Sequence, residues 1–241
     1  MRGDGRAADA LRAIRFEVDF TEQPLASVLC RVGRTFVLCT VSEEASVPRF
    51  LAGTGRGWLT AEYSMLPGST DTRAEREAAR GRPSGRTLEI QRLIGRSLRA
   101  VIDLDALGER TFWVDCDVLQ ADGGTRCASI TGASVALSIA AARLVARGAL
   151  ARNPVRDSVA AVSVGIVKGE LLLDLPYVED SVAEIDMNVV ATGAGRFVEV
   201  QGTGEHGTFS RDELARLTDL ALRGTSELTR LQADAVRGAK R

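Results

Sequence analysis

Apolar and polar residues alternate along two stretches of the chain, residues 14–20 and 111–120. A period of two predicts strands with one buried face. Continuous apolar runs predict three more strands, at residues 57–63 and at residues 27–32 and 35–41, the last two joined as a hairpin at Gly33. The first part of the chain is therefore expected to form a sheet.

Helical spacing follows these strands in two places. The apolar residues of the first helix recur three and four apart, and this places three arginines together on another face: Arg92, Arg96 and Arg99. The second helix, residues 128–150, is so rich in apolar residues that it must be buried on nearly every side. Residues 66–86, before the first helix, are polar and rich in arginine, glycine and proline, which predicts a long loop.

The second part of the chain repeats the order of strands followed by a helix. Two hairpins are predicted, residues 159–167 with 170–175 and residues 182–192 with 196–201. Ser210 and Glu213 form a capping box for a last helix that reaches about residue 236. We therefore expect an α/β fold in one domain, with two similar halves, residues 10–150 and 155–236, that share one core.

Composition narrows the class of protein. Hydrophobic residues make up 45% and charged residues 26%, as in a soluble globular protein. The first residues contain no apolar signal region, and the most apolar later run, residues 133–142, is too short to span a bilayer, so we expect a cytoplasmic protein with no membrane partner. His206 is the only histidine, which excludes a zinc site built on a histidine pair. The four cysteines lack CxxC spacing and are expected to be core thiols rather than a metal or redox site.

Charge is distributed unevenly along the chain. The net charge is only −1, yet residues 71–100 hold eight arginines against four acidic residues. Such a run is typical of a solvated helical face, and it also suits a phosphate-binding surface because guanidinium groups bind phosphate with two donors. The sequence leaves both interpretations open.

A paired glycine lies between a predicted strand and the most apolar helix. We call Gly123, Gly124, Thr125 and Arg126 the glycine loop. Two glycines let successive backbone N–H groups converge, a helix start adds partial positive charge, and Arg126 adds a cation, which together suit a bound phosphate. The alternative is a strand-to-helix turn without a ligand.

Two acidic residues lie just before and within the strand predicted at residues 182–192. Asp180 and Asp186 are six residues apart, and if that segment is extended they share one face. Two such carboxylates could hold Mg²⁺ or Mn²⁺, or one could protonate a leaving oxygen, and the alternative is a solvated turn. Residues 202–207 spell GxGxxG, but no strand with an acidic residue follows, so a turn is expected rather than a dinucleotide site.

Several longer motifs occur together and in a recognisable order. They are Met1-Arg2 with Asp4-Gly5-Arg6, VPRFL at 47–51, GWLTAEY at 57–63, GRT at 85–87 with EIQRLIGRSLR at 89–99, DCDV at 115–118 with QADGGTR at 120–126, DMNVV at 186–190 and EVQGT at 199–203. In these motifs the chain closely resembles the ribonuclease PH family, over nearly its whole length.

The resemblance implies a fold of two βαβα-like halves and phosphate-dependent trimming of RNA 3′ ends, chiefly of tRNA precursors. The products would be nucleoside 5′-diphosphates, and reverse nucleotide addition is also implied. Inorganic phosphate would be the attacking co-substrate, bound by Arg86, Gly124, Thr125 and Arg126. The catalytic or metal-binding residues would be Asp180 and Asp186, with Mg²⁺ or Mn²⁺ as the metal. The resemblance also implies a homohexamer, a trimer of dimers, with RNA contacts at Arg73, Arg76, Arg92, Arg96 and Arg99. Of these, Arg73 and Arg76 match positions that are linked to ring assembly as well as to tRNA contact.

This chain departs from the family pattern at three positions: Gly68 replaces a usual arginine, Cys127 a usual threonine and Gly204 a usual alanine.

Two other functions stay open, a catalytically silent RNA-binding ring subunit and a hydrolytic metal-dependent nuclease. A silent subunit tends to lose its phosphate-binding or acidic residues, and this chain keeps both. We also expect Arg126 to be a surface cation, so that its replacement removes activity without unfolding the protein.

Overall fold

A five-stranded sheet forms the first half of the protein. The computed structural model describes residues 2–239, without the side chains of residues 78 and 80, so Met1 of the first motif lies outside the described residues. The strand order is β1-β2-β3-β5-β4, in which only β4 and β5 run parallel. The strands are β1 (Ile14–Val18), β2 (Ala26–Val32), β3 (Thr35–Glu44), β4 (Trp58–Met65) and β5 (Thr111–Gln120).

Helices α1 (Gly85–Arg99) and α3 (Thr125–Ala146) cover one face of this sheet. Ser84 caps α1 by accepting a hydrogen bond from the backbone N–H of Thr87 at 3.1 Å. Three shorter helices lie in the connections: α2 (Leu104–Leu107) and the 3₁₀ helices η1 (Arg49–Leu51) and η2 (Glu77–Arg80).

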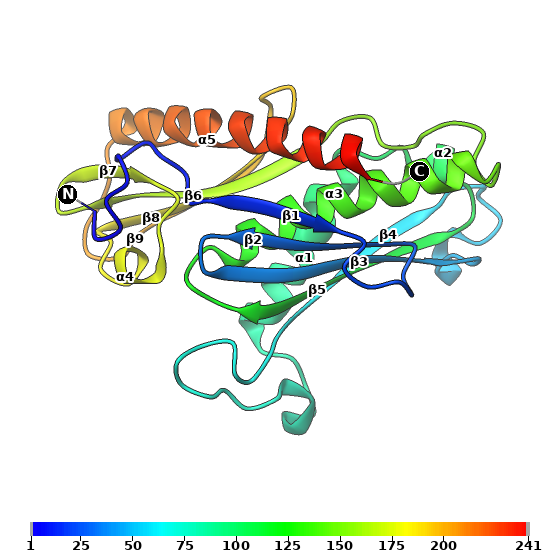
Figure 1. Ribbon diagram of the computed structural model, residues 1–241, viewed down its shortest axis with the longest axis horizontal. Coiled ribbons are helices and arrows are strands. Elements are labelled where there is room, and N and C mark those ends of the chain that lie inside the picture. The colour runs from blue at the N-terminus through cyan, green and yellow to red at the C-terminus, as the bar shows by residue number, and fades with distance from the viewer. Residues whose placement is uncertain (1, 240–241) are drawn as a thin grey trace.

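A four-stranded antiparallel sheet, in the order β7-β6-β8-β9, forms the second half (Figure 1). One turn of helix, α4 (Tyr177–Asp180), lies in the connection between β7 and β8, and the long helix α5 (Arg211–Gly238) crosses the sheet. The predicted capping box of Ser210 and Glu213 at the start of α5 is confirmed. The strands are β6 (Val159–Val167), β7 (Glu170–Leu173), β8 (Ile185–Thr192) and β9 (Phe197–Gly204).

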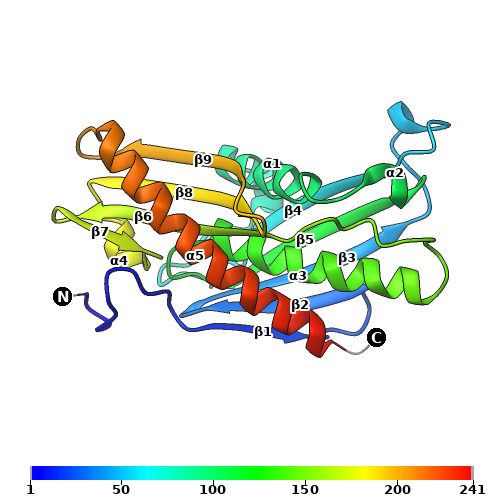
Figure 2. The same ribbon diagram turned by 90° about the horizontal axis from the view of Figure 1, so that it is seen from above.

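Helix α3 connects the two halves. It contacts β2 and β3 of the first sheet, β6 of the second sheet and helix α5, as Figure 2 shows from above. At 22 residues it is the one helix among residues 2–239 that is long and apolar enough to cross a membrane, which the shorter run seen in the sequence did not suggest. Because 78% of its most apolar window is buried inside the protein, its apolar character is explained by its place in the core.

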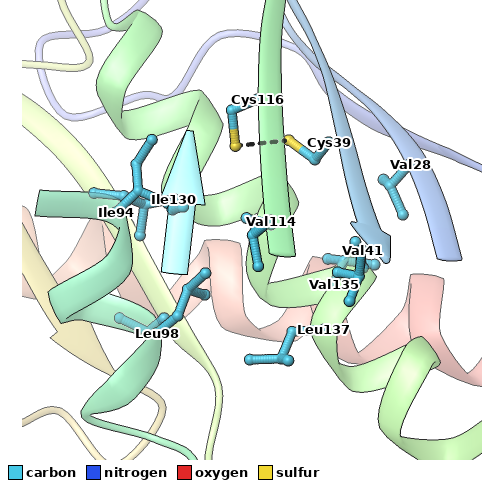
Figure 3. Close-up of a cluster of buried hydrophobic side chains, with 14 of the residues drawn as sticks. Val28, Cys39, Val41, Ile94, Leu98, Val114, Cys116, Ile130, Val135 and Leu137 are labelled. Carbon is cyan, nitrogen blue, oxygen red and sulfur yellow. Dashed lines mark hydrogen bonds between the residues drawn. The ribbon is translucent and has the colours of Figure 1, made fainter. Parts of the chain in front are cut away.

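The largest core cluster lies between the first sheet and helices α1 and α3. Side chains from β3, β5 and both helices interdigitate there, as the labelled Val41, Val114, Leu98 and Leu137 show in Figure 3. The cluster also includes Val159, Ala161 and Val190 from the second sheet, and a second cluster lies between that sheet and α5. One core cluster thus contains residues from both halves, while the second half also has core residues of its own.

All four cysteines are buried and free, which confirms the prediction of core thiols. Cys39 and Cys116 face each other across β3 and β5, with their sulfur atoms 3.9 Å apart (Figure 3). Burial raises the pKa of the Cys30 thiol, and that of Cys127 to about 12, so these thiols stay protonated at neutral pH.

Three expected boundaries near the candidate site residues or the core are wrong. Helix α3 begins at Thr125 rather than residue 128 and ends at Ala146 rather than residue 150, because Gly148 adopts a φ of 71° just after the helix. Strand β8 begins at Ile185 rather than residue 182. Asp180 ends α4, so it does not share an extended segment with Asp186, and the argument that placed both on one face of a strand is wrong.

Candidate active site

The glycine loop leads directly from β5 into α3. Gly123 and Gly124 adopt φ angles of 74° and 66°, a region that favours glycine. A Cβ atom on Gly123 would lie 2.7 Å from the backbone nitrogen of Tyr177 and 2.8 Å from the carbonyl oxygen of Leu175. Only glycine therefore allows this loop to pack against the segment that carries α4.

No side chain caps the N-terminus of α3, where Gly124 is the N-cap residue. The partial positive charge of this helix start is consequently available to an anion. Thr125 follows at once, and its hydroxyl oxygen accepts a hydrogen bond of 2.9 Å from the Tyr63 hydroxyl. Since burial raises the pKa of Tyr63, that phenol stays protonated and donates, which leaves the Thr125 proton free for an external acceptor.

A cavity of about 620 Å³ opens in front of this helix start. It brings together five of the residues named from the sequence: Arg86, Gly123, Gly124, Thr125 and Asp180. Arg86 is the second residue of α1 and is exposed, so its guanidinium can reach a ligand in the cavity. The glycine loop therefore lines a cavity together with a second cation, as a bound anion would require.

Arg126 lies beside the cavity and is held from two sides. It donates to the Gln201 side-chain oxygen at 2.7 Å, and its guanidinium lies 3.6 Å from a Glu89 carboxylate oxygen. Its side chain is only 15% exposed, so the expectation of a surface cation is wrong. The two polar contacts orient the guanidinium rather than neutralise it, because Glu89 is distant and partly exposed.

The two aspartates share the electrostatic environment of these arginines. Burial raises the pKa of Asp180, while the charges of Arg86 and Arg126 lower it. Burial and then the charge of Asp180 raise the pKa of Asp186 to about 6. Because the charge of Asp180 acts on Asp186, and the charges of Arg86 and Arg126 act on both carboxylates, the two aspartates share one environment although their backbone positions differ.

Asp186 holds an unusual oxygen atom. Its Oδ1 is buried and accepts no hydrogen bond from any described residue, while Oδ2 receives a weak one of 3.4 Å from Asn188. A buried carboxylate oxygen without a donor is costly unless a cation or proton satisfies it. No group of three or more histidine, cysteine, aspartate or glutamate residues within the described chain could hold a metal ion, so a cation here would have two carboxylates and other oxygen ligands.

The five arginines named for RNA contact differ in their surroundings. Arg96 is exposed and pairs with Glu199 at 2.5 Å, whereas Arg99 lies over the Trp58 ring at 4.9 Å and donates to the Leu59 carbonyl. Three others are exposed and make no ion pair with a described residue: Arg73, Arg76 and Arg92. Within the part of the chain that the structure describes, these three guanidinium groups have no ion-pair partner, while Arg96 and Arg99 have structural partners.

Sequence reasoning missed several residues of the site. Asp71 and Tyr177 line the cavity with Thr70 and Thr72, yet the sequence indicates only a loop at 66–86 and no element at 177–180. Tyr63, Glu89 and Gln201 contact Thr125 and Arg126 from other elements. Alternation along β4 places Tyr63 on its buried face, which is a signal for a core residue but not for its hydroxyl partner.

Models of the 3′ exoribonuclease family match both halves of the chain, domain 1 over residues 10–142 and domain 2 over residues 157–224. Ribonuclease PH of Bacillus subtilis is 59% identical over 229 residues, which cover 95% of this chain and 94% of that relative. Ribonuclease PH of Corynebacterium kroppenstedtii is 58% identical over 236 residues, which cover 98% and 93% of the two chains.

Solved structures share the fold at lower sequence identity. Rice Rrp46 has a TM-score of 0.78 at 18% identity and covers 98% of this chain and 100% of its own. An Archaeoglobus fulgidus exosome with RNA bound to the active site has a TM-score of 0.79 at 24% identity, with 94% and 91% covered. With family models matching both halves and close relatives aligned end to end, the chain belongs to the 3′ exoribonuclease family that includes the ribonuclease PH proteins.

Proposed function

We propose that this protein is a phosphate-dependent 3′-to-5′ exoribonuclease that trims the 3′ ends of tRNA precursors. It releases nucleoside 5′-diphosphates, and the reverse addition of nucleotides uses the same site. The observation that carries this proposal is the cavity that a helix N-terminus, Arg86 and Thr125 line together with Asp180. Anion-binding groups and an acidic group in one cavity suit phosphoryl transfer, in which phosphate is the nucleophile.

Inorganic phosphate would occupy the glycine loop. The start of α3, the Thr125 hydroxyl and the guanidinium groups of Arg86 and Arg126 supply its donors. A phosphate oxygen then attacks the phosphorus of the last phosphodiester bond. That bond breaks, the terminal nucleotide leaves as a diphosphate, and the 3′ oxygen of the shortened RNA takes up a proton.

Asp186 is suited to supply that proton. Its pKa of about 6 keeps part of the population protonated near neutral pH, and a general acid works best when its pKa is close to the working pH. Asp180, which lines the cavity and lies near both arginines, stays with the phosphates as the more ionised carboxylate. This assignment gives the two aspartates different roles set by their surroundings.

The donor set also fits Mg²⁺ or Mn²⁺, because both aspartates offer hard oxygen ligands and Asp186 Oδ1 has no other partner in the described chain. When bound, such an ion would neutralise charge on the phosphate oxygens. Asp180 and Asp186 are the residues that would hold it.

The site needs both halves of the chain, so we propose that residues 10–150 and 155–236 act as a single unit. The glycine loop and Arg86 belong to the first half, and both aspartates belong to the second. We further place the protein in the cytoplasm, where tRNA precursors are trimmed.

We also propose a homohexamer, and the helix-free face of the first sheet supports an assembly. Glu62, Asp115 and Asp117, here called the acidic surface, are neighbours on β4 and β5. Burial and then the charge of Glu62 raise the pKa of both Asp115 and Asp117, because the carboxylates of this surface repel one another. The exposed Arg73 and Arg76 of a second copy carry the charge that would relieve it. Light scattering should then give about six times the 25.7 kDa of one chain, and a monomer at all concentrations would contradict the assembly.

Incubating a tRNA precursor with the protein and Mg²⁺, with and without inorganic phosphate, tests the activity. Nucleoside diphosphates released only with phosphate are the expected result. Nucleoside monophosphates released without phosphate would instead identify a hydrolytic nuclease. RNA binding without any release would identify a silent ring subunit.

A further inference from the structure

The residues before β1 carry two buried arginines. Arg2 and Arg12 are 7% and 6% exposed, and they are the only buried arginines among the described residues. In Figures 1 and 2 this segment runs past β7 and α4 before it enters the first sheet. It therefore contacts the second half of the protein and the first half within a dozen residues.

Arg2 anchors α4 through Glu179, the neighbour of Asp180. Its guanidinium donates to both Glu179 carboxylate oxygens, at 3.0 and 2.6 Å. It also donates to the carbonyl oxygens of Leu173 at 2.8 Å and Asp174 at 3.0 Å. The short helix that presents Asp180 is thus tied to the connection that follows β7.

Arg12 contacts both loops of the candidate active site with one guanidinium. It forms a two-pronged pair with Asp174, at 3.0 and 2.7 Å, and its backbone N–H donates to the same carboxylate at 2.8 Å. Its remaining nitrogen, Nη1, donates to the Asp122 carbonyl oxygen at 2.6 Å, directly before Gly123. A Cβ atom on Gly124 would lie 3.0 Å from Nη2, so the guanidinium also lies against the glycine loop.

Asp174 is held in a conformation that needs support. Its φ is 55°, a left-handed value that is uncommon outside glycine, and its carboxylate is nearly fully buried. Backbone strain of this kind persists only where the surroundings fix it, and it clusters at functional sites. A buried ion pair is also a weak source of net stability, so stability alone does not explain the arrangement.

We propose that Arg12 and Asp174 are positioning residues that set the distance between the glycine loop and the connection that carries α4 and Asp180. Neither residue lines the cavity, so both hold the loops from outside it, and the charge of Arg12 also favours the ionised form of Asp180. Phosphoryl transfer needs phosphate and carboxylates at fixed positions, and a shift of about 1 Å costs on the order of 10²-fold in rate. This inference rests on the proposed phosphorolytic function.

The test is the double variant Arg12→Met with Asp174→Asn. It removes both charges of the pair together, and Arg6, which also lies 3.7 Å from the Asp174 carboxylate, keeps its closer ion pair with Asp4 at 2.6 Å. Asparagine tolerates the left-handed backbone of residue 174. We expect a cooperatively folded protein whose kcat/KM for phosphorolysis is lower by about 10²-fold, with a higher KM for inorganic phosphate. Arg12→Lys keeps the charge but not the fork of donors, and it should recover only part of the activity.

Asp103→Asn provides the matched control. Asp103 has the same 6% side-chain exposure as Asp174 and pairs with Arg152 and Arg156, but it caps α2 at the far end of the first sheet. It should leave kcat and the KM for phosphate within twofold of the unmodified protein. An equal kinetic loss in this control would overturn the inference, because general destabilisation would then explain both variants.

Hydrogen exchange at residues 121–128 and 174–182 separates this inference from the proposed activity. The double variant should exchange faster in both segments, while the Asp103→Asn variant should not. A folded double variant with unchanged exchange or unchanged kinetics would overturn the positioning role. If the unmodified protein releases no diphosphate, the proposed function fails, and exchange alone still decides whether Arg12 and Asp174 hold the two loops.

Discussion

At the scale of one residue, the surroundings of Asp186 disfavour its ionised form and thus lower the stability of the folded protein at neutral pH. Its carboxylate is largely buried, lies near another acidic group and has one oxygen without a hydrogen-bond donor among residues 2–239. Each of these features opposes ionisation, and together they raise the pKa to about 6. The residue suits proton transfer because its surroundings disfavour the ionised carboxylate.

Asp186→Asn should therefore stabilise the protein while removing most of its activity. The folded protein binds the Asp186 proton more tightly than the unfolded chain, so this residue's contribution to stability falls as the pH rises from about 4 to about 6. Above that window the variant should gain on the order of 1–3 kcal/mol, or a few degrees in Tm, and below about pH 4 it should gain nothing. Thermal unfolding in EDTA from pH 4 to 8 measures this, and a gain that is the same at every pH would contradict the assignment.

Arg126 makes a second prediction at this scale. Arg126→Ala should lower kcat/KM for phosphorolysis by roughly 10²- to 10³-fold, as expected for loss of one donor to a reacting phosphate. Stability should change by less than about 1 kcal/mol, because Glu89 is partly exposed and can be hydrated. The kcat/KM of Arg126→Lys should lie between those of the unmodified protein and Arg126→Ala, since lysine keeps the charge but loses the two-pronged set of donors. Unchanged activity in Arg126→Ala would remove this residue from the phosphate site.

At the scale of elements, the glycine loop joins two segments that lie far apart in the sequence. Three glycines have similar positive φ angles but different surroundings: Gly123, Gly124 and Gly148. Alanine substitutions at these positions can therefore separate the energetic cost of the backbone angle from the cost of a steric clash. Nothing lies within 4 Å of a Cβ on Gly148, only the end of the Arg12 side chain lies near one on Gly124, and backbone atoms of residues 175–177 lie under 3 Å from one on Gly123.

Alanine substitutions in this series should be graded. Gly148→Ala should cost about 1–2 kcal/mol for the backbone angle and leave activity intact. Gly123→Ala should cost more, because backbone must move, and should abolish phosphorolysis by displacing α4 and Asp180. The losses of stability and activity in Gly124→Ala should lie between those of Gly148→Ala and Gly123→Ala. Urea unfolding and diphosphate release measure the two effects, and equal losses at all three positions would contradict the contact argument.

The elements that the sequence predicts well are those with a long regular pattern. Strand β5 was predicted to the residue because its side chains alternate between the core and the open face. Helix α4 is not predicted because four residues contain no period, and the sequence therefore indicates an extended segment at Asp180, at the entry to a strand. The pair of Arg12 and Asp174 joins residues 162 positions apart, and no local pattern indicates such a contact. The resemblance to a family named the site residues, while the geometry that relates them required the fold.

At the scale of the whole molecule, RNA binding depends on where unpaired cations remain. Arg73 and Arg76 lie in the exposed segment between β4 and α1, which Figure 1 shows extending away from both sheets. Binding of single-stranded RNA falls with salt by about 0.7 in log K per phosphate contact for each tenfold change.

Replacing both Arg73 and Arg76 by alanine should thus reduce the salt slope of RNA binding by about 1.4. The matched control replaces Arg223 and Arg230, two exposed arginines of α5, and should leave the slope unchanged. Fluorescence anisotropy with a labelled oligoribonucleotide at several salt concentrations measures both variants. Because the same loop is proposed to join copies of the chain, light scattering must accompany each measurement. An unchanged slope in a variant of unchanged size would exclude these arginines from the RNA path.

Helix α3 begins at the glycine loop and packs against both sheets, so the phosphate site exists only while both halves are folded. A ligand that binds only the folded state shifts the folding equilibrium by mass action. Inorganic phosphate, the proposed co-substrate, would consequently add about 1.4 kcal/mol of stability for each tenfold excess over its Kd. The phosphate supply of the cell would then govern how long the protein survives as well as how fast it trims RNA.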